Sequence, residues 1–401
     1  MLHVSDRQRR DRIALRHGID PARRRADAED ATRAVAVLHA TEPATVHLSL
    51  QARVDGLRRS DVERVLHEER TLVKQLAMRR TLFVLPRDLL PAAWGSASAR
   101  VAGTERARLA KDAEAHGLAD PGGGAAWVER ARREVLGVVA GSVEGRQAAE
   151  VRAAVPALAA PAPVAGAPSS SVPPTVSRLL TLLGAEAEVV RGVNTGHWRV
   201  SRPRWAPMAA WLGEEPRPWS ASDGWAELVR RWLGAFGPGT EADLVWWLGS
   251  TKGIVRAALA RLEAVEVALD GGATGWLLPD DDLLDHPLDG ARGQEVGPWA
   301  ALLPVLDPTV MGWKERAFYL GPHRDALFDR NGNAGTTAWW DGRVVGCWVQ
   351  DEAGRVLVRL LEEVPAAGRA ALEAEADRLS DWLAGERVGT VYPSPAMRAP
   401  A

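Results

Sequence analysis

Residues 224–279 carry a hydrophobic pattern whose period changes partway along the segment. Apolar side chains first recur every three to four positions, the spacing that places them on one face of a helix. After residue 263 the apolar runs become short and are separated by glycines, as in a pair of strands. The pattern predicts three helices and two strands, at residues 225–236, 240–248, 253–263, 265–269 and 275–278.

Turn-forming residues separate these five elements. Gly237, Pro238 and Gly239 end the first helix and leave Thr240 to cap the second. The sequence Asp-Gly-Gly-Ala-Thr at residues 270–274 is typical of the turn of a β-hairpin. Three short helices followed by a hairpin form the winged-helix layout, which presents its third helix to the major groove of DNA.

The third of these helices carries basic side chains on one face. Lys252 and Arg256 are four residues apart and therefore share a side of the helix. Ile254, Ala258 and Leu259 belong to an apolar stripe that faces inward. Such a basic face suits DNA, and it also suits the solvated surface of a domain that binds only protein. The segment favours DNA binding and leaves the second interpretation open.

Two earlier parts of the chain repeat this layout of helices followed by strands. Residues 31–100 form the first repeat, in which Ser60 and Glu63 have the spacing of a capping box at a helix start. The apolar runs of this repeat predict three helices and two strands, at residues 31–38, 43–54, 60–69, 73–78 and 80–84.

Residues 101–223 form the second repeat. Its apolar runs predict three helices, two strands and a turn between the strands, at residues 127–139, 146–153, 175–183, 187–191, 198–201 and 192–196. Residues 156–174 interrupt this repeat and are rich in Ala, Pro and Ser, which is typical of an insertion rather than of a packed element. Three similar layouts in one chain favour an extended DNA-binding scaffold over a single regulator-type reader.

The pattern changes again after residue 297. Short apolar runs around turns such as Asp341-Gly342 predict a small antiparallel sheet or barrel, with strands at residues 301–306, 336–340, 343–350 and 356–361. A long amphipathic helix follows at residues 365–383, and we expect the tail after Gly385 to be loosely held. We therefore predict an α+β protein with a basic segment, three tandem winged-helix units and a β-rich C-terminal domain, at residues 1–30, 31–100, 101–223, 224–296 and 297–401.

Composition narrows the class of protein. The chain has 401 residues, 46% of them apolar, and a formal net charge of −2, so it can bury substantial cores but is not uniformly basic. Positive charge for DNA must therefore be localised. The single cysteine, Cys347, excludes disulfides within the chain and cysteine metal sites. We find no signal-peptide core and no apolar span of membrane length, so we expect a cytoplasmic, nucleoid-associated protein without membrane contact.

The N-terminus is the most basic stretch. Its arginines are Arg7, Arg9, Arg10, Arg12, Arg16, Arg23, Arg24 and Arg25. Such a cluster can attach electrostatically to DNA, because each neutralised phosphate releases counterions. A solvated amphipathic helix, with Asp11 and Asp20 nearby, explains the cluster equally well.

Four stretches that lie far apart in the chain form a recognisable set. They are Leu-Ala-Met-Arg-Arg-Thr-Leu at 76–82, Gly-Pro at 237–238 with Asp-Leu-Val-Trp-Trp-Leu-Gly at 243–249, Leu-Pro-Val-Leu-Asp-Pro-Thr at 303–309, and Trp-Asp-Gly-Arg-Val-Val-Gly at 340–346. Together, and in this order, they resemble the winged-helix DNA glycosylases of the AlkZ and YcaQ type. Each stretch alone is weak, but the set is specific and runs from about residue 30 to about residue 385.

The resemblance implies tandem winged helices and a C-terminal β-rich domain bent around double-stranded DNA. It also implies hydrolysis of the N-glycosidic bond of bulky purines alkylated at N7 or N3, including natural-product adducts and cross-links, and a role in self-resistance to such genotoxins. Members of this family use a Gln-x-Gln or Gln-x-Asp motif at the end of the first helix. In this chain the matching positions read His39-Ala40-Thr41.

The side chains of the altered motif can still carry out the steps that this reaction needs. A purine alkylated at N7 is already cationic, so the enzyme mainly has to place a water and stabilise charge at the sugar. An imidazole and a hydroxyl can both hold a water, and His39 can also accept its proton. Pro43 biases Glu42 away from helical geometry, and in an extended segment His39 and Thr41 face the same way.

Both motif residues also have a structural explanation. Thr41 can cap the helix that begins at Glu42 or Pro43. His39 can sit at the C-terminus of the preceding helix, where its protonated form is favoured. We keep this explanation open beside the catalytic one.

Further candidates for DNA contact are basic residues near predicted turns. A pair of arginines before a strand-like run suits either a phosphate contact or a bracing ion pair. A cationic, aromatic loop after Pro308 suits either backbone phosphate or an ordinary solvated turn. With the basic face of the third helix, the predicted DNA-binding set is Arg79, Arg80, Lys252, Arg256, Trp313, Lys314, Arg316, His323 and Arg324.

Several other chemistries have no support in the sequence. The chain has no Walker loop, no serine nucleophile elbow and no metal-ligand spacing, and we expect neither a metal nor a cofactor. Two interpretations remain. The first is a monofunctional, monomeric DNA glycosylase that acts on double-stranded DNA carrying alkylated or bulky purine adducts. The second is a winged-helix DNA-binding protein without chemistry, either a regulator or a protein that sequesters adducts.

Overall fold

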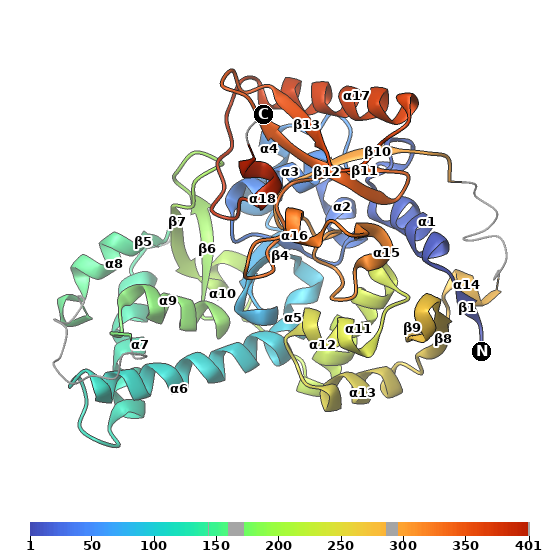
Figure 1. The fold of residues 1–401 in the computed structure, drawn as a ribbon. Coiled ribbons are helices and arrows are strands. Elements are labelled where there is room, and N and C mark those ends of the chain that lie inside the picture. Colours follow the sequence, from blue (N-terminus) through green and yellow to red (C-terminus); the bar gives the residue numbers. More distant parts are fainter. Residues whose placement is uncertain (143, 159–171, 286–295, 400–401) are drawn as a thin grey trace. The chain divides into compact units, whose positions relative to one another are not determined.

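The computed structural model describes residues 1–142, 144–158, 172–285 and 296–399, and its helices and strands are shown in Figure 1. The chain divides into two compact units: unit 1 is Met1–Val65 with Ala226–Ala401, and unit 2 is Leu66–Trp225. Each unit combines helices with small, mostly antiparallel sheets, which is the α+β class expected from the sequence. The predicted segment 31–100 contributes residues to both units.

The three helices and the hairpin predicted for residues 224–279 are present. They are α11 (Ala221–Phe236), α12 (Glu241–Leu248), α13 (Lys252–Arg261), β8 (Val265–Leu269) and β9 (Thr274–Leu277). Thr240 caps α12 as predicted: its hydroxyl accepts the N–H of Asp243, and the Asp243 carboxylate accepts the N–H of Thr240. A strand that the sequence did not indicate, β1 (His3–Val4), pairs in parallel with β8.

The C-terminal sheet of unit 1 follows the predicted strands. Its order is β10 (Ala300–Leu303), β11 (Thr337–Trp340), β12 (Arg343–Gln350) and β13 (Val356–Leu360), and all neighbours are antiparallel. Helix α17 (Ala366–Leu383), with Pro365 as its N-cap, packs against β10, β11 and β13 (Figure 1). Gly368 permits this close approach, because a Cβ atom there would lie 2.9 Å from the ring of Trp340.

The first part of unit 1 contains α2 (Ala28–Ala34), β2 (Leu38–His39), α3 (Pro43–Gln51) and α4 (Arg59–Glu63). The helix predicted at residues 60–69 is present, because α4 continues as a π-helix at Arg64–Glu68, whereas β2 was not predicted. The expected capping box of Ser60 and Glu63 is wrong, because the N-cap of α4 is Arg58, whose N–H donates to Asp61 at 2.9 Å. The remaining helices of unit 1 are α1 (Asp6–His17), α14 (Asp282–Asp285), α15 (Ala317–Leu320), α16 (Arg324–Leu327) and α18 (Pro395–Arg398).

Unit 2 contains a two-stranded hairpin, a group of helices and a three-stranded sheet of order β5–β7–β6. Its elements are β3 (Leu72–Leu76), β4 (Leu82–Pro86), α5 (Leu90–Ala93), α6 (Ala99–Ala115), α7 (Gly124–Ala140), β5 (Arg146–Gln147), α8 (Ala148–Ala154), α9 (Val176–Ala185), β6 (Val189–Asn194), β7 (Pro203–Pro207) and α10 (Met208–Leu212). Most of the predicted insertion 156–174 lies outside the described residues.

Two features of unit 2 differ from the sequence prediction. Residues 198–201 are not a strand, because β6 continues through the expected turn as far as Asn194, and its partner β7 starts only at Pro203. Helix α6 gave no clear apolar pattern, because its buried positions include Glu105 and small alanines beside Leu109.

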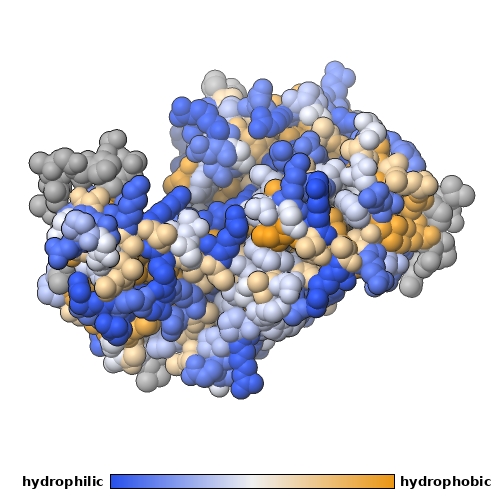
Figure 2. All heavy atoms as spheres, turned by 90° about the horizontal axis from the view of Figure 1, so that it is seen from below, coloured by the Kyte–Doolittle hydropathy of each residue, from blue (hydrophilic) through white to orange (hydrophobic). Residues whose placement is uncertain are grey.

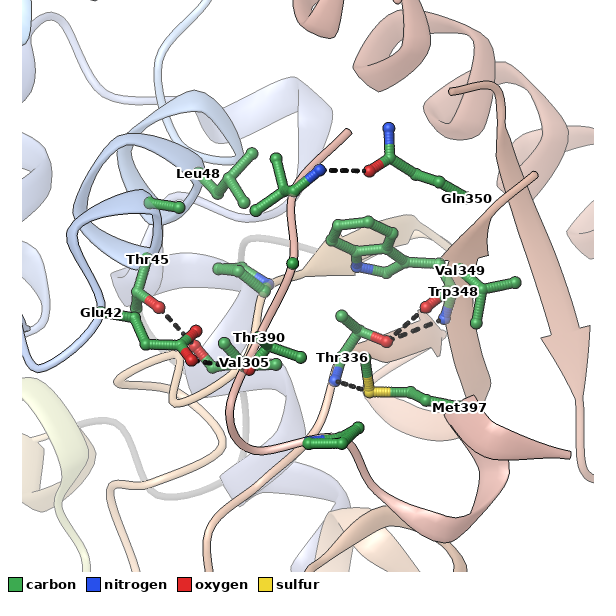
Figure 3. Close-up of a pocket in the computed structure, with 15 residues that line it drawn as sticks. Glu42, Thr45, Leu48, Val305, Thr336, Trp348, Val349, Gln350, Thr390 and Met397 are labelled. Atoms are coloured by element: carbon green, nitrogen blue, oxygen red, sulfur yellow. Dashed lines mark hydrogen bonds between the residues drawn. The ribbon is translucent and has the colours of Figure 1, made fainter. Parts of the chain in front are cut away.

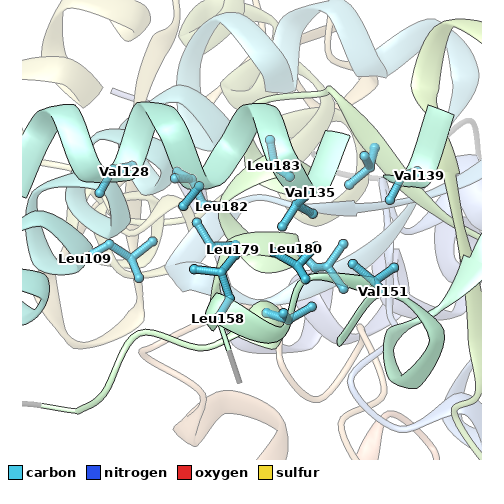
Figure 4. Close-up of a cluster of buried hydrophobic side chains, with 14 of the residues drawn as sticks. Leu109, Val128, Val135, Val139, Val151, Leu158, Leu179, Leu180, Leu182 and Leu183 are labelled. Carbon is cyan, nitrogen blue, oxygen red and sulfur yellow. The ribbon is translucent and has the colours of Figure 1, made fainter. Parts of the chain in front are cut away.

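Helices α6, α7, α8 and α9 enclose the hydrophobic core of unit 2, which Figure 4 shows. Leu109, Val135, Val151 and Leu179 contribute one buried side chain from each of these helices. Each such burial contributes about 1.5–3 kcal/mol. The core holds the helices against the sheet through Trp205 of β7.

In unit 1, a row of polar side chains ties α3 to the loop after β10. Thr45, Ser49 and Arg53 recur every four residues and so lie on one side of α3 and of the turn that follows it. The Thr45 hydroxyl donates to the carbonyl of Val305 at 3.1 Å, and the Ser49 hydroxyl donates to Asp307 at 2.8 Å.

Arg53 and Asp307 form the central contact of this row. The guanidinium donates to both carboxylate oxygens, at 2.7 and 2.8 Å, and neither side chain has exposed surface. The N–H of Thr309 adds a further hydrogen bond at 2.9 Å. Burial of two charges is tolerated only where they are paired and their other hydrogen-bonding positions are satisfied. The Asp307 carboxylate meets that condition.

Thr309 extends the contact to α1. Its hydroxyl accepts from Arg53 at 2.8 Å and lies 2.9 Å from Nδ1 of His17, whose Nε2 lies 3.0 Å from the carbonyl of Ala235. Because a carbonyl only accepts, Nε2 carries the proton and Nδ1 accepts from Thr309. Burial, reinforced by the Arg53 charge, lowers the pKa of His17 to about 3. The imidazole is therefore a neutral link between α1, α3 and α11.

The N-terminal arginines brace unit 1 from within. Arg12 is buried and donates to Asp281 at 2.6 Å and to the Gly237 carbonyl at 2.7 Å. Arg16 also donates to Asp281, at 3.0 Å, and Arg24 pairs with Glu375 at 2.7 Å. These contacts favour the explanation of the arginine cluster as part of an amphipathic helix over electrostatic attachment to DNA. Unlike that expectation, α1 is packed inside unit 1 and is not solvated.

Figure 2 shows one face of the molecule, on which hydrophilic side chains predominate and hydrophobic ones form smaller, separate patches. Among the described residues, the most exposed large hydrophobic side chains are Met1, Val391 and Val172. No helix in the described ranges is both long and apolar enough to cross a membrane.

Replacing Asp307 by Asn tests the buried ion pair. The variant leaves the Arg53 guanidinium buried without its counter-charge, so we expect the free energy of unfolding to fall by about 3–5 kcal/mol. The measurement is urea denaturation followed by circular dichroism. The control Asp325→Asn makes the same change at a side chain that is 99% exposed, and its effect should stay below about 0.5 kcal/mol. Equal losses in the two variants would contradict the role of the pair.

The dependence of stability on pH tests the neutral state of His17. Its pKa is lowered from 6.5 to about 3 in the folded protein, so between these values the unfolded chain binds more protons and stability is lost as pH falls. We expect His17→Gln to flatten the plot of unfolding free energy against pH by up to about 1.4 kcal/mol per pH unit between about pH 4 and 6. The control is His3→Gln, at a side chain that is 57% exposed. The same slope in wild type and His17→Gln would refute the assignment.

Candidate functional site

The candidate motif lies where the chain passes from β2 into α3. His39 is the last residue of β2, Glu42 is the N-cap of α3, and Pro43 is the first residue of the helix. Glu42 has φ −101° and ψ 124°, which is the extended geometry predicted for a residue before proline. The motif therefore sits on a short link between a strand and a helix, which we call the β2–α3 link (residues 39–42).

Neither motif residue has the structural role that the sequence left open. Thr41 does not cap α3, because the N-cap is Glu42, and Glu42 makes no side-chain capping bond. His39 belongs to a strand and not to a helix C-terminus. His39 is only 5% exposed, whereas Thr41 is exposed. The link therefore holds an interior imidazole and an exposed threonine, so the two residues differ in exposure and do not share one exposed face as expected from an extended segment.

A cavity of about 190 Å³ lies beside the link in unit 1, and Figure 3 shows its lining. It is bounded by α3, by the loop after β10, by Thr336 just before β11, by the end of β12, and by the C-terminal tail, which we define as residues 386–399. Most of the lining is apolar, including Trp348. The polar side chains are Glu42, Thr45, Thr336, Gln350 and Thr390.

The C-terminal tail crosses this cavity and holds the link through Glu42 (Figure 3). Oε1 of Glu42 accepts hydrogen bonds from the Thr390 hydroxyl at 2.8 Å and from the N–H of Val391 at 2.7 Å. Burial raises the pKa of Glu42, and these hydrogen bonds act against the rise because they favour the carboxylate. Glu42, the residue that follows Thr41, is therefore held in place by the C-terminal tail and not by contacts within α3.

The tail is also anchored before and after the two residues that bind Glu42. Gln350 accepts the N–H of Val388 at 2.8 Å and donates to the Glu386 carbonyl at 2.9 Å. Farther along, Arg359 donates to the Ala399 carbonyl at 2.6 Å. The expectation that the tail after Gly385 is loosely held is therefore wrong, because side chains of β12 and β13 satisfy its backbone groups.

Arg79 and Arg80 lie in the tight turn between β3 and β4 of unit 2. Their φ angles are 54° and 58°, a left-handed conformation that costs a non-glycine residue about 1–2 kcal/mol. Nε of Arg80 lies 2.7 Å from Oε1 of Glu105 on α6. Arg80 thus has the bracing ion pair that was one of its two expected roles, and the phosphate contact of Arg79 stays a prediction.

Lys252 and Arg256 share one acidic neighbour in unit 1. Glu241 of α12 accepts from Arg256 at 2.5 and 3.2 Å and lies 3.8 Å from Nζ of Lys252. Both basic side chains are nevertheless largely exposed. One carboxylate faces two positive charges, so this part of α13 keeps a positive excess.

Trp313 does not offer a surface to DNA. It is 2% exposed, and its ring packs against those of His17, Phe236 and Phe318 in the core of unit 1. The cause is Asp243, whose Oδ1 accepts the N–H groups of the next two residues, 314 and 315, at 2.8 and 2.7 Å and draws the loop inward. The predicted DNA contact of Trp313 is therefore corrected to a core role.

The other residues of this loop differ in how far they are engaged. Lys314 is exposed, and Arg324 has a side chain that is 70% exposed. The Arg316 guanidinium lies over the rings of Trp246 and Phe328 at 5.0 and 4.6 Å. His323 contacts Glu362 at 2.8 Å through Nε2. Lys314 and Arg324 are thus the members of this group that are open to a phosphate.

Sequence reasoning missed two parts of the site. The Glu42–Thr390 contact joins residues 348 positions apart and has no local signal. The row of Thr45, Ser49 and Arg53 did have one, because polar residues at four-residue intervals on a buried helix indicate a hydrogen-bonded face. In the described part of the chain, no group of His, Cys, Asp or Glu is arranged to hold a metal ion.

Comparison with known proteins agrees with the resemblance noted in the sequence. Residues 32–382 match the family model described as DNA glycosylase AlkZ-like. A search of the curated proteins found no match. Among solved structures, the DNA glycosylase AlkZ of Streptomyces sahachiroi is similar in fold, with a TM-score of 0.71, 19% sequence identity, and coverage of 95% of this chain and 98% of that one.

Replacing Glu42 by Ala tests the hold of the tail on the link. The change removes the acceptor of two hydrogen bonds, so we expect the backbone amides of residues 388–394 to exchange with deuterium about tenfold faster or more, measured by mass spectrometry. Glu42→Gln keeps an acceptor oxygen and should show a smaller change. The control Glu373→Ala removes a carboxylate from α17. Unaltered protection of the tail in Glu42→Ala would rule out this contact as its anchor.

Proposed function

Because the chain belongs to the AlkZ-like DNA glycosylase family, we propose that it hydrolyses the N-glycosidic bond of bulky purines alkylated at N7 or N3 in double-stranded DNA. The observation that carries the proposal is the position of His39 and Thr41 on the β2–α3 link, where neither serves as a helix cap. The family match runs from residue 32 to residue 382 and includes the link, which supports an activity of the same kind.

Cleavage of this glycosidic bond requires only a few contributions from the protein. When the C1′–N9 bond of a cationic alkylpurine breaks, its electron pair moves to the base, which leaves neutral. The sugar becomes an oxocarbenium-like centre that a water attacks, and the water must then lose a proton. The protein therefore has to place that water and accept its proton.

Thr41 and His39 divide this work according to their exposure. Thr41 is exposed, and its hydroxyl holds the water by a hydrogen bond. His39 lies mostly in the interior, so its imidazole reaches the reaction through that water and accepts its proton as the oxygen bonds to C1′. The Glu42 contact with the tail restricts where the hydroxyl of the preceding residue can lie.

Exposed basic side chains supply the DNA contacts. Lys252, Arg256, Lys314 and Arg324 are exposed in unit 1 and suit backbone phosphates. Arg79 of unit 2 is half-buried, and we keep it as a predicted phosphate contact. Arg80, Arg316 and His323 are engaged with Glu105, aromatic rings and Glu362, and we give them a positioning role instead.

The enzyme is monofunctional and monomeric in this proposal. Cleavage of the DNA strand by β-elimination requires an amine nucleophile. No lysine occurs before Lys74, and none lines the cavity beside the link. The product is then an intact strand with an abasic site. Such bulky alkylated purines include adducts that genotoxic natural products form with DNA. Their removal makes the cell that produces the natural product resistant to it.

Base release from a defined duplex tests this proposal. We expect wild type to release the modified base from DNA carrying a bulky N7-alkylguanine, detected as free base by mass spectrometry and as alkali-labile sites on a gel. His39→Ala should lower the single-turnover rate about 10²–10⁴-fold, the usual contribution of a proton-accepting group. Thr41→Ala should lower it about tenfold or more, since the water loses a hydrogen bond.

A matched variant separates chemistry from folding. His39→Gln restores the glutamine of the family motif at this position and should retain more release than His39→Ala. Circular dichroism of all variants checks that they fold. Release by His39→Ala at the wild-type rate would remove His39 from the mechanism. Tight duplex binding without release by wild type would favour the alternative, a DNA-binding protein that acts without chemistry.

A further inference from the structure

The cavity beside the β2–α3 link offers room for a small molecule. Its volume is about 190 Å³, and a dry apolar cavity of roughly 150 Å³ is enough to hold a benzene molecule. The described residues that line it do not include His39 or Thr41, to which we assign the chemistry. The space is therefore separate from the proposed reaction, and its lining decides what kind of molecule fits there.

The side chains that line the cavity have already used their hydrogen-bond donors. Five of them donate to oxygen atoms of unit 1, namely Thr45, Thr336, Trp348, Gln350 and Thr390. The amide of Gln350 uses both of its N–H bonds, which donate to the carbonyls of Gly354 and Glu386 at 2.7 and 2.9 Å. A ligand that carries acceptor oxygens would lose its water in this cavity and find none of these donors free, which is unfavourable.

The charge of Glu42 also has partners. Glu42 is the only charged residue among the described lining residues. Its Oε1 accepts from the Thr390 hydroxyl and from the N–H of Val391, at 2.8 and 2.7 Å, and these bonds stabilise the carboxylate without a cation. A ligand anion would be repelled by this carboxylate, and a ligand cation would lose its water to meet an oxygen that is already hydrogen-bonded. The lining therefore favours a molecule without charge.

Flat apolar groups make up much of the remaining wall. The rings of Trp348, Pro304 and Pro393 belong to the lining, together with the side chains of Leu48 and Met397 (Figure 3). An aromatic ligand can pair with the indole of Trp348 in an offset or edge-to-face arrangement, which an aliphatic molecule cannot do. Shape and polarity therefore favour a small aromatic molecule.

The C-terminal tail forms one wall of the cavity. The tail contributes Val388, Pro393 and Met397, and α3 contributes Leu48. Gly389 also lines the cavity although it is exposed, so the wall is thin there and a small molecule can enter beside the tail. A ligand that contacts both the tail and α3 binds only while the tail is in place. Its binding therefore stabilises the attached tail.

We propose that this cavity is a binding site for a small, uncharged aromatic molecule, which stabilises the C-terminal tail against α3 when it binds. The site uses side chains of α3, of β12 and of the tail, all of which belong to unit 1. The inference goes beyond the proposed action on DNA and does not depend on it. It gives the tail a second role, since the segment that holds Glu42 also responds to a ligand.

Nuclear magnetic resonance of methionine methyl groups tests the site in the whole chain. The chain has five methionines, of which Met397 alone is among the described lining residues, and Met397→Leu assigns its signal. Toluene should shift this signal in a saturable manner, because the bound ring lies close to the methyl group, and should leave the signals of Met78 and Met208 in unit 2 in place. Benzylamine and benzoate carry a positive and a negative group on the same ring, and both should bind at least about tenfold more weakly.

Substitutions of Leu48 test the location and the size of the site. Leu48→Trp fills part of the cavity and should weaken the binding of toluene about tenfold or more. Leu48→Ala enlarges the cavity and should raise the affinity for naphthalene relative to toluene. The control Leu357→Trp makes the same change on β13, at a side chain that is 41% exposed, and should leave binding unchanged. Circular dichroism checks the folding of each variant, and the comparison of the three ligands in wild type needs no variant.

Hydrogen exchange measures the effect of the ligand on the tail. At saturating toluene, the backbone amides of residues 388–394 should exchange at least about tenfold more slowly, whereas those of unit 2 should keep their rates. Unchanged exchange in the tail would refute its stabilisation by the ligand.

The other outcomes decide whether the site exists and which ligands it takes. Equal binding of toluene, benzylamine and benzoate, or shifts spread over all five methionines, would refute the site. Tighter binding of benzylamine than of toluene would refute the uncharged class of ligand. Base release by wild type is measured separately, so a failure of the cavity site leaves the glycosylase proposal standing.

Discussion

The Arg53–Asp307 ion pair is the contact on which the arrangement of unit 1 around the motif depends. It has no exposed surface, and an unpaired charge in that position would cost several kcal/mol. The pair therefore fixes the position of α3 relative to the loop after β10. Through Thr309 and His17 the same contact reaches α1 and α11. The β2–α3 link therefore leads into a helix that cannot shift freely. Glu42 adds a second hold from the C-terminal tail.

Arginine serves two separate purposes in this protein. Arg12, Arg24 and Arg80 form ion pairs that join elements of the fold, and the first two of these belong to the basic N-terminus. Arg256 and Arg324 have exposed side chains, and we propose them for contact with DNA. This division reconciles a net charge of −2 with a family that acts on DNA, because affinity depends on local charge rather than on the total.

Periodicity in the sequence was sufficient for most elements and insufficient for their contacts. The helices of residues 224–279 and α17 were predicted because one face of each is regularly apolar, and the hairpin and the last four strands because short apolar runs are separated by turn residues. The spacing of apolar residues does not show which element packs against an apolar face. Neither the burial of Trp313 nor the Glu42–Thr390 contact could therefore be predicted. The link was located through the family motif and the proline after it. The burial of His39 depends on neighbours that the local sequence does not contain.

A crystal structure of the wild-type protein with a duplex that carries a cationic sugar mimic, in place of one alkylated nucleotide, is the most direct test of where the chemistry occurs. The mimic should lie at the β2–α3 link, with an ordered water within about 3 Å of both the Thr41 hydroxyl and the His39 imidazole, on the C1′ side of the ring. A mimic bound away from this link, with no water that reaches either side chain, would contradict the assignment of His39 and Thr41 as the groups that place and deprotonate the attacking water.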